Sequence, residues 1–138
     1  IRVVEDISPD LIISADLILF QELIDNLVGN ALKFISPETG VIIIHAWHEG
    51  DNSVISISDT GIGLAADEKE KIFVEFFKSD RSRHDRTSIG LGLSICRRIV
   101  QKHGGDIHAE SDGPLTGTTF VIRIPDIQRD DIPASPIN

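Results

Sequence analysis

The spacing of apolar positions along the chain predicts helices of different lengths. Apolar residues recur at helical spacing from Asp16, which suits an N-cap, up to Pro37, which cannot continue a helix. A second long helix is predicted from about Leu91 to His103, with Gly104-Gly105 as its C-cap pair. Between these two, the pattern predicts a shorter helix from about Asp67 to Phe77.

Short apolar, β-branched runs predict the strands. Val41–Trp47 and Val54–Ser58 flank the turn signal Gly50-Asp51-Asn52 and are expected to form a hairpin. The other extended segments are expected at Arg2–Val4, Ile12–Ser14, Ile107–Ala109 and Thr118–Ile124. Because the strands are grouped in pairs with helices between them, this order favours a mixed sheet with helices on one face over a parallel doubly wound sheet.

Composition limits the classes of function. The 138 residues suit one domain, which we assign to residues 1–126, with residues 127–138 as a polar tail or linker. A net charge of −9 argues against nucleic-acid binding, and no apolar run approaches the ~18 residues of a membrane span, so we expect no direct membrane contact. The only cysteine, Cys96, is expected to be a buried free thiol, which fits a reducing, cytoplasmic compartment. Since the chain has no methionine, we expect it to be a segment excised from a longer protein.

One side of the first long helix carries a polar stripe. Its members follow one another at steps of four, four and three residues, and they are Glu22, Asn26, Asn30 and Lys33. Asparagine is only a moderate helix former, so two of them one turn apart suggest the wall of a binding site. Amide oxygens there could ligate Mg²⁺, and Lys33 could pair with a phosphate. A plain solvent-facing stripe would explain the same pattern.

Two glycine-rich segments adjoin predicted elements. Asp59-Thr60-Gly61-Ile62-Gly63 follows a strand, and its glycines permit tight bends and the close approach of a ligand. Ser88-Ile89-Gly90-Leu91-Gly92-Leu93 runs into a helix, whose free N–H groups favour a phosphate. A plain turn would explain the first segment, and a plain loop-to-helix junction the second. The basic residues between Lys78 and Lys102 fit either a small-anion site or a solvated helix face.

The order and spacing of these segments resemble those of histidine protein kinase catalytic domains. The similarity runs from about Arg2 to Pro125. The matching blocks are Asn26/Asn30/Lys33-Phe34, Asp59-x-Gly61-x-Gly63, Ile72-Phe73-x-x-Phe76-Phe77, Gly90-Leu91-Gly92-Leu93 and Gly117-Thr118-Thr119-Phe120. This family shares a superfamily, known as GHKL, with gyrase B, MutL and the large heat-shock chaperones. The resemblance implies their α+β Bergerat fold, a two-layer sandwich in which a mixed, mostly antiparallel sheet carries three helices on one face.

The resemblance also implies which residues of the first long helix bind Mg-ATP. Asn30 would ligate Mg²⁺, with Asn26 beside it. Lys33 would approach the phosphates, and Phe34 would lie along the adenine. Asn26, Asn30 and Lys33 are therefore the expected catalytic residues.

The other blocks would bind the rest of the nucleotide. Asp59 would accept a hydrogen bond from the adenine amino group and so reject guanine, which has a carbonyl at that position. Gly61 and Gly63 would let the backbone run close past the base, and the Thr118 hydroxyl would lie near the base. The expected phosphate contacts are Gly90, Leu91 and Gly92, together with Arg83 of a lid at residues 78–88.

Two details of these blocks carry expectations of their own. Ser88 stands where the family's glycine block usually opens with glycine, which is expected to cost some lid flexibility. Of the aromatic residues Phe73, Phe76 and Phe77, two are expected in the core.

The implied activity is phosphoryl transfer rather than hydrolysis. Related ATPases carry a glutamate general base where Asn26 stands, and an amide cannot take a proton. None of the five histidines has the family's phosphoacceptor motif. The acceptor would therefore be a histidine on a separate dimerisation domain of a homodimeric two-component sensor kinase, which passes the group to a response-regulator receiver domain. The parent could be anchored in a membrane. A degenerate domain acting only as a scaffold is the alternative, against which the filled ligand positions argue.

Overall fold

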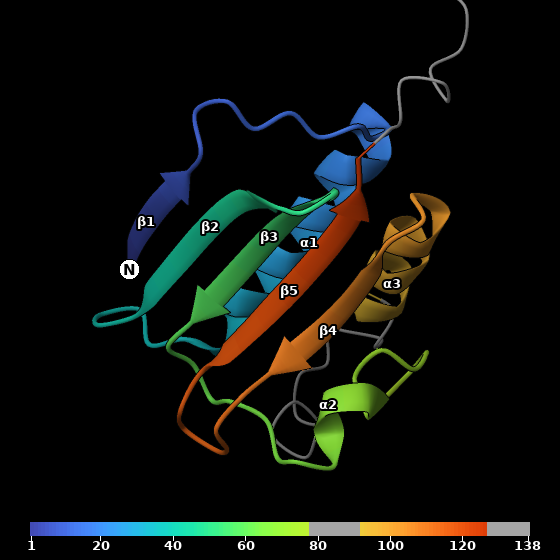
Figure 1. Cartoon of the computed structure of the whole chain (residues 1–138). Helices are drawn as coiled ribbons and strands as arrows, with labels where there is room; N and C mark the ends of the chain where they lie inside the picture. The colour runs from blue at the N-terminus through green and yellow to red at the C-terminus, as the bar shows by residue number, and fades with distance from the viewer. Residues whose placement is uncertain (78–91, 127–138) are drawn as a thin grey trace, which may run out of the picture.

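The computed structural model describes residues 1–77 and 92–126. Within these ranges, five strands form one sheet in the order β1-β2-β3-β5-β4, with the helices on one side of it (Figure 1). The strands are β1 (Arg2–Ile7), β2 (Val41–Glu49), β3 (Asn52–Asp59), β4 (Asp106–Glu110) and β5 (Thr118–Pro125). The helices are α1 (Leu17–Phe34), α2 (Glu68–Lys71) and α3 (Gly92–Lys102). Strand β1 is parallel to β2 and the other neighbouring pairs are antiparallel, which confirms the expected α+β sandwich.

Helix α1 begins and ends where its sequence signals predict. The Asp16 side chain caps it by accepting the Leu19 N–H at 2.9 Å. The residues that it buries recur every four positions, and they are Leu23, Leu27 and Ala31. This apolar face packs on the sheet, so the polar stripe on the same helix is left for other contacts.

The end of α3 is tied to the start of α1. Gly104 has φ 74°, and the Gly105 N–H donates to the Val100 oxygen at 3.0 Å, which completes the predicted glycine C-cap. The Asp16 N–H donates to Nε2 of His103 at 2.9 Å, so the neutral ring carries its proton on Nδ1, 2.7 Å from a carbonyl oxygen of α3. The imidazole thus joins the two long helices.

Cys96 lies buried where α3 packs on α1, as expected for a structural free thiol. Its Sγ is 3.8 Å from the Leu23 oxygen. Burial, and then the negative charge of Glu22, raise the pKa of Cys96 to about 12. The thiol therefore stays protonated at neutral pH and is a poor nucleophile.

The side of the sheet that faces the helices forms the core, together with part of the aromatic block. Phe73 is 3% exposed and packs edge-to-face on Phe120, with ring centroids 6.2 Å apart. Phe77 packs against the same cluster, whereas Phe76 is 68% exposed. The expectation that two of these three phenylalanines belong to the core is confirmed.

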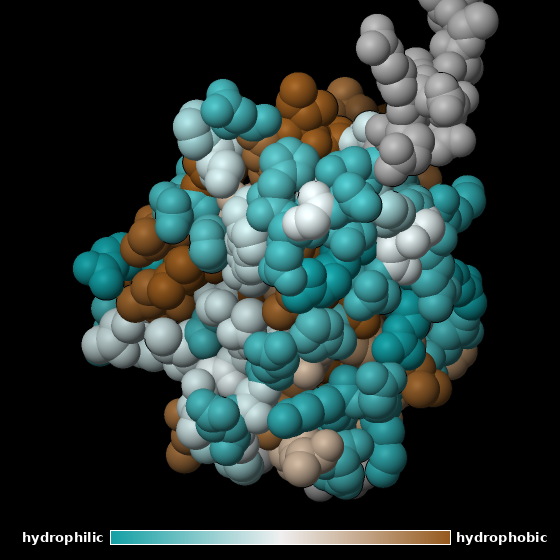
Figure 2. Space-filling view, in the orientation of Figure 1, coloured by the Kyte–Doolittle hydropathy of each residue, from teal (hydrophilic) through white to brown (hydrophobic). Residues whose placement is uncertain are grey.

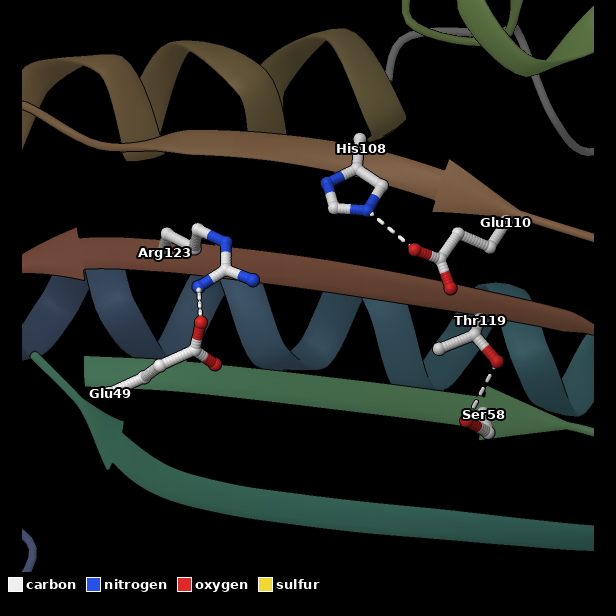
Figure 3. A network of polar contacts seen from close by, with 6 residues as sticks. All are labelled: Glu49, Ser58, His108, Glu110, Thr119 and Arg123. Carbon is white, nitrogen blue, oxygen red and sulfur yellow. Dashed lines mark hydrogen bonds and ion pairs between the residues drawn. The ribbon is translucent and has the colours of Figure 1, made fainter. Parts of the chain in front are cut away.

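The opposite side of the sheet is open and largely polar. Figure 2 shows this side mostly in hydrophilic colours, with hydrophobic colour gathered toward β1 and β2. Polar side chains on this side join the strands (Figure 3). Arg123 of β5 reaches past β3 to Glu49 of β2 at 3.1 Å, Ser58 of β3 contacts Thr119 of β5 at 2.8 Å, and His108 contacts Glu110 along β4 at 2.9 Å. No helix in the described ranges is both long and apolar enough to cross a bilayer.

Strands β2, β3 and β4 differ from their predicted bounds by no more than two residues, but three other predictions are wrong. Helix α2 covers only Glu68–Lys71 rather than Asp67–Phe77, because the chain then turns and Phe76 adopts φ 64°, which a right-handed helix does not allow. Ile12–Ser14 belongs to no strand. Strand β1 continues past Val4 to Ile7, since its backbone stays paired with β2 as far as Ala46.

Candidate functional site

Asp59 ends β3 on the helix-facing side of the sheet, opposite buried Thr118 of β5. Its Oδ1 accepts the Gly61 N–H at 2.8 Å, and the carboxylate also accepts the backbone N–H of Thr118. Burial raises the pKa of Asp59, and these two hydrogen bonds partly offset the increase. A carboxylate has about four acceptor sites, so this one keeps capacity for a donor on a ligand.

The loop after Asp59 packs too closely on its neighbours to carry side chains at its glycines. A Cβ on Gly61 would lie 2.7 Å from the Phe34 carbonyl oxygen. Gly63 has φ 69°, and a Cβ there would lie 2.2 Å from the Gly113 carbonyl oxygen. Contacts inside the protein therefore require both glycines, in addition to any requirement that a ligand would impose.

The connection between β4 and β5 supports this loop from behind. The Gly117 N–H donates to the Gly61 oxygen at 3.1 Å, and the Leu115 N–H donates to the Ile62 oxygen at 2.7 Å. Ser111 makes a further side-chain contact, since its Oγ accepts the Leu64 N–H at 3.0 Å. Ser111 was not predicted from the sequence, because a serine just before a glycine turn is ordinary turn chemistry and gives no signal of a binding site.

The polar stripe of α1 runs between this loop and the start of α3. Asn26 and Asn30 are half-buried, whereas Lys33 is exposed, with its Nζ 6.0 Å from the centre of the Phe34 ring. The Asn26 Nδ2 donates to the Glu22 oxygen at 2.9 Å, and a Cβ on Gly92 would lie 3.3 Å from the Asn26 Oδ1. The amide oxygen of Asn26 therefore faces the first turn of α3.

The structure arranges the candidate residues along α1. Phe34 adjoins the Asp59 loop, and Asn26 adjoins Gly92 about 12 Å away along the helix axis. At the end of the site near the Asp59 loop lie the candidates Phe34, Asp59, Gly61, Gly63 and Thr118. At the end near α3 lie Asn26 and Gly92. Asn30 and Lys33 lie between these two ends, on α1. The candidates Arg83, Gly90 and Leu91, and Ser88, lie outside the described residues.

The donor set suits an anionic ligand with a hard cation. Backbone N–H groups at the start of a helix such as α3 favour a phosphate, and amide oxygens such as those of Asn26 and Asn30 suit Mg²⁺. Residues 1–77 and 92–126 contain no cluster of three or more His, Cys, Asp or Glu side chains placed to hold a metal. Mg²⁺ that keeps several waters and binds phosphate oxygens needs only one or two protein ligands, so Asn30 and Asn26 fit that arrangement.

Comparisons with known proteins converge on one family. The family model described as histidine kinase-, DNA gyrase B-, and HSP90-like ATPase matches residues 15–128. The circadian input-output histidine kinase CikA of Synechococcus elongatus is 37% identical over 107 residues, which cover 77% of this chain and 14% of CikA. The chain thus spans a small part of that relative's length.

Solved structures agree with the sequence matches. The catalytic domain of histidine kinase ThkA has a TM-score of 0.76 at 32% identity, covering 91% of this chain and 79% of that chain. Full-length ShkA in complex with AMPPNP has a TM-score of 0.78 at 28% identity, covering 99% of this chain and 27% of that chain.

Proposed function

We propose that this chain binds Mg-ATP and donates the γ-phosphoryl group to a histidine on a separate domain. The premise is that the chain belongs to the family of histidine kinase-, DNA gyrase B- and HSP90-like ATPases, as a histidine kinase catalytic domain. The observation that carries the proposal is the Asp59 carboxylate, withdrawn from water and oriented by the N–H groups of Gly61 and Thr118. A half-buried acceptor selects a ligand with a donor at that position, as adenine has in its amino group. The similar protein ShkA was solved with AMPPNP, which supports a nucleotide as ligand.

The nucleotide would lie along α1. Its base would meet Asp59, Phe34 and the Thr118 hydroxyl at the loop end, because the withdrawn acceptor is there. Its phosphates would lie toward Lys33 and the first turn of α3, where cationic and N–H groups favour anions. Asn30 would hold Mg²⁺, with Asn26 beside it, and the ion would neutralise charge on the phosphate oxygens.

Asn26 favours transfer over hydrolysis. A hydrolase needs a base on water, a role worth roughly 10²–10⁴-fold in rate. The Asn26 amide cannot accept a proton, and its nitrogen already donates to the Glu22 oxygen. The phosphoryl group would instead pass to a histidine of the dimerisation domain in a homodimeric sensor kinase, and from there to a response-regulator receiver domain.

We expect the isolated chain to bind Mg-ATP without phosphorylating itself. Incubation with γ-labelled ATP should leave the chain unlabelled and release phosphate slowly, because no base activates water. Adding the phosphoacceptor domain of the parent protein should give acid-labile, base-stable label on that domain. Fast phosphate release by the chain alone would contradict the kinase assignment, and absence of ATP binding would overturn the proposal.

Asn30→Ala should remove the dependence of ATP binding on Mg²⁺. We expect EDTA to lower the ATP affinity of the wild-type chain roughly tenfold or more, and to change that of the variant little, because the protein ligand of the ion is gone. Calorimetric titrations with and without Mg²⁺ measure both. Asn52→Ala, at the far end of β3 from Asp59, is the control and should keep the full dependence. An Asn30→Ala variant that keeps it would exclude Asn30 as the ligand.

A further inference from the structure

We propose that Ser111 is a positioning residue for the base loop, defined as residues 59–63, an inference that rests on the proposed function. Ser111 directly follows β4, and its hydroxyl group lies within hydrogen-bond distance of four backbone groups and of the Thr116 hydroxyl group. It accepts the Leu64 N–H at 3.0 Å and the Gly113 N–H at 3.3 Å, and it donates to the Gly117 oxygen at 2.7 Å. One hydroxyl group can make these three bonds together, because it has one donor and two acceptor sites, and the Gly117 oxygen is a closer acceptor for its proton than the Gly113 oxygen at 3.2 Å.

These bonds join the base loop to the β4–β5 connection. The two segments run side by side through the hydrogen bonds of Gly117 to Gly61 and of Leu115 to Ile62. The Ser111 hydroxyl group adds a third link beyond them, because it contacts Leu64 on one segment and Gly117 on the other. The Gly117 peptide is thus held on both sides, by Gly61 through its N–H and by Ser111 through its oxygen.

The base loop depends on such links more than an ordinary loop does. Gly61 and Gly63 have no side chains with which to anchor it, and Leu64 is the first buried apolar side chain that follows. Thr60 ties the start of the loop to Val41 of β2, and the hydrogen bonds to the β4–β5 connection hold the rest of it. Since the Gly61 N–H orients the Asp59 carboxylate, a displaced loop would also misplace the group that reads the base.

Ser111 itself does not belong to the surface that would meet the nucleotide. It acts behind the loop, through Leu64 and Gly117, so its effect on binding is indirect. Removing its hydroxyl group would leave the Leu64 N–H and the Gly117 oxygen without their present partner. A water molecule could bond to either group, but it would not connect the two segments to β4.

Ser111→Ala should bind ATP roughly tenfold more weakly than the wild-type chain, a loss typical of one to two hydrogen bonds. Ser111→Thr keeps the hydroxyl group and should restore affinity to within about threefold. Ser58→Ala is the matched control, because Ser58 lies next to Asp59 in β3 but its hydroxyl group contacts Thr119 on the open side of the sheet (Figure 3). Its ATP affinity should stay within about twofold of wild type. Calorimetric titrations at a temperature where every variant is folded measure these affinities.

Amide hydrogen exchange separates positioning from general destabilisation. In Ser111→Ala without nucleotide, the amides of Gly61 and Leu64 should exchange about tenfold faster, while the amide of Ile55 in the centre of β3 should change little. Equal acceleration at all three amides, or wild-type ATP affinity in Ser111→Ala, would overturn the inference while leaving the proposed function standing. A wild-type chain that fails to bind ATP would overturn both.

Discussion

Asp59→Ala should weaken ATP binding about 10- to 100-fold, because a charge-assisted hydrogen bond of roughly 1.5–3 kcal/mol is lost. The carboxylate is the acceptor at the end of β3, and two backbone N–H groups hold it in place. The alanine side chain offers no acceptor to the base and also releases the Gly61 N–H. Isothermal titration calorimetry with Mg-ATP measures the change directly.

Asp59→Asn is the matched control, since it has nearly the same shape and keeps one acceptor oxygen. It should also lose affinity for ATP, because an amide NH₂ replaces one acceptor and the negative charge is gone. Unchanged affinity in both variants would show that Asp59 does not read the base.

The pH dependence of folding stability, compared between the wild-type chain and Asp59→Asn, provides an independent check that the Asp59 carboxylate is desolvated. Burial raises the pKa of Asp59 above its unfolded value, so the ionised carboxylate costs folding free energy at neutral pH. This cost disappears as the pH falls through the raised pKa, whereas an asparagine has no such dependence. The unfolding temperature of the wild-type chain should therefore rise relative to that of Asp59→Asn as the pH is lowered through this range. A constant difference would mean that the carboxylate is not desolvated.

Gly117→Ala should lower the free energy of unfolding by more than about 3 kcal/mol. Gly117 has φ 83°, and a Cβ there would lie 2.1 Å from the Asp59 carbonyl oxygen. The Asp59 oxygen belongs to the backbone and the backbone also fixes the position of Cβ, so no rotation of a side chain relieves the clash. Because the clash falls on the residue that is expected to read adenine, ATP binding should be lost as well. Chemical denaturation and ATP titration measure the two effects.

Gly50→Ala separates the clash from the conformational strain. Gly50 lies in the β2–β3 turn with φ 61°, and a Cβ there would have no atom within 4 Å. Its replacement should therefore cost only the left-handed strain, about 1–2 kcal/mol, and should leave ATP affinity unchanged. Similar losses of stability in the two variants would show that the contact of Gly117 with Asp59 is unimportant.

The parts of the fold that could be predicted from sequence are those determined by neighbouring residues. Helix α1 has its cap, its apolar spacing and its breaker within one segment, and the β2–β3 hairpin has its turn signal between two apolar runs. Strand β1 was predicted too short because all six of its side chains are exposed, so its pattern of burial gives no period. Helix α2 was predicted too long because the phenylalanines suggest helical spacing, whereas packing places Phe76 in a left-handed conformation.

The candidate site likewise contains residues that a local motif predicts and residues whose importance depends on distant parts of the chain. Asp59, Gly61 and Gly63 could be selected because they share a short motif at a strand end. The reason that Gly63 and Gly117 must be glycine could not be inferred from sequence, since the atoms they would strike belong to Gly113 and Asp59, which are 50 and 58 residues away along the chain. Ser111 gave no signal, because its importance comes from two backbone groups on other segments. The roles of these residues in binding remain predictions.

The position of β5 has a consequence for how the chain is synthesised. It is the last in sequence of the five strands in the described residues, yet it lies inside the sheet between β3 and β4 (Figure 1). A ribosome therefore releases β3 and β4 before the strand that joins them exists, and until then β3 presents an unpaired edge open to other nascent chains. Asp59 also lacks the Thr118 N–H during this interval. The carboxylate that is expected to read the base would thus be complete only after β5 has joined the sheet, and the exposed edge of β3 would need protection from aggregation until then.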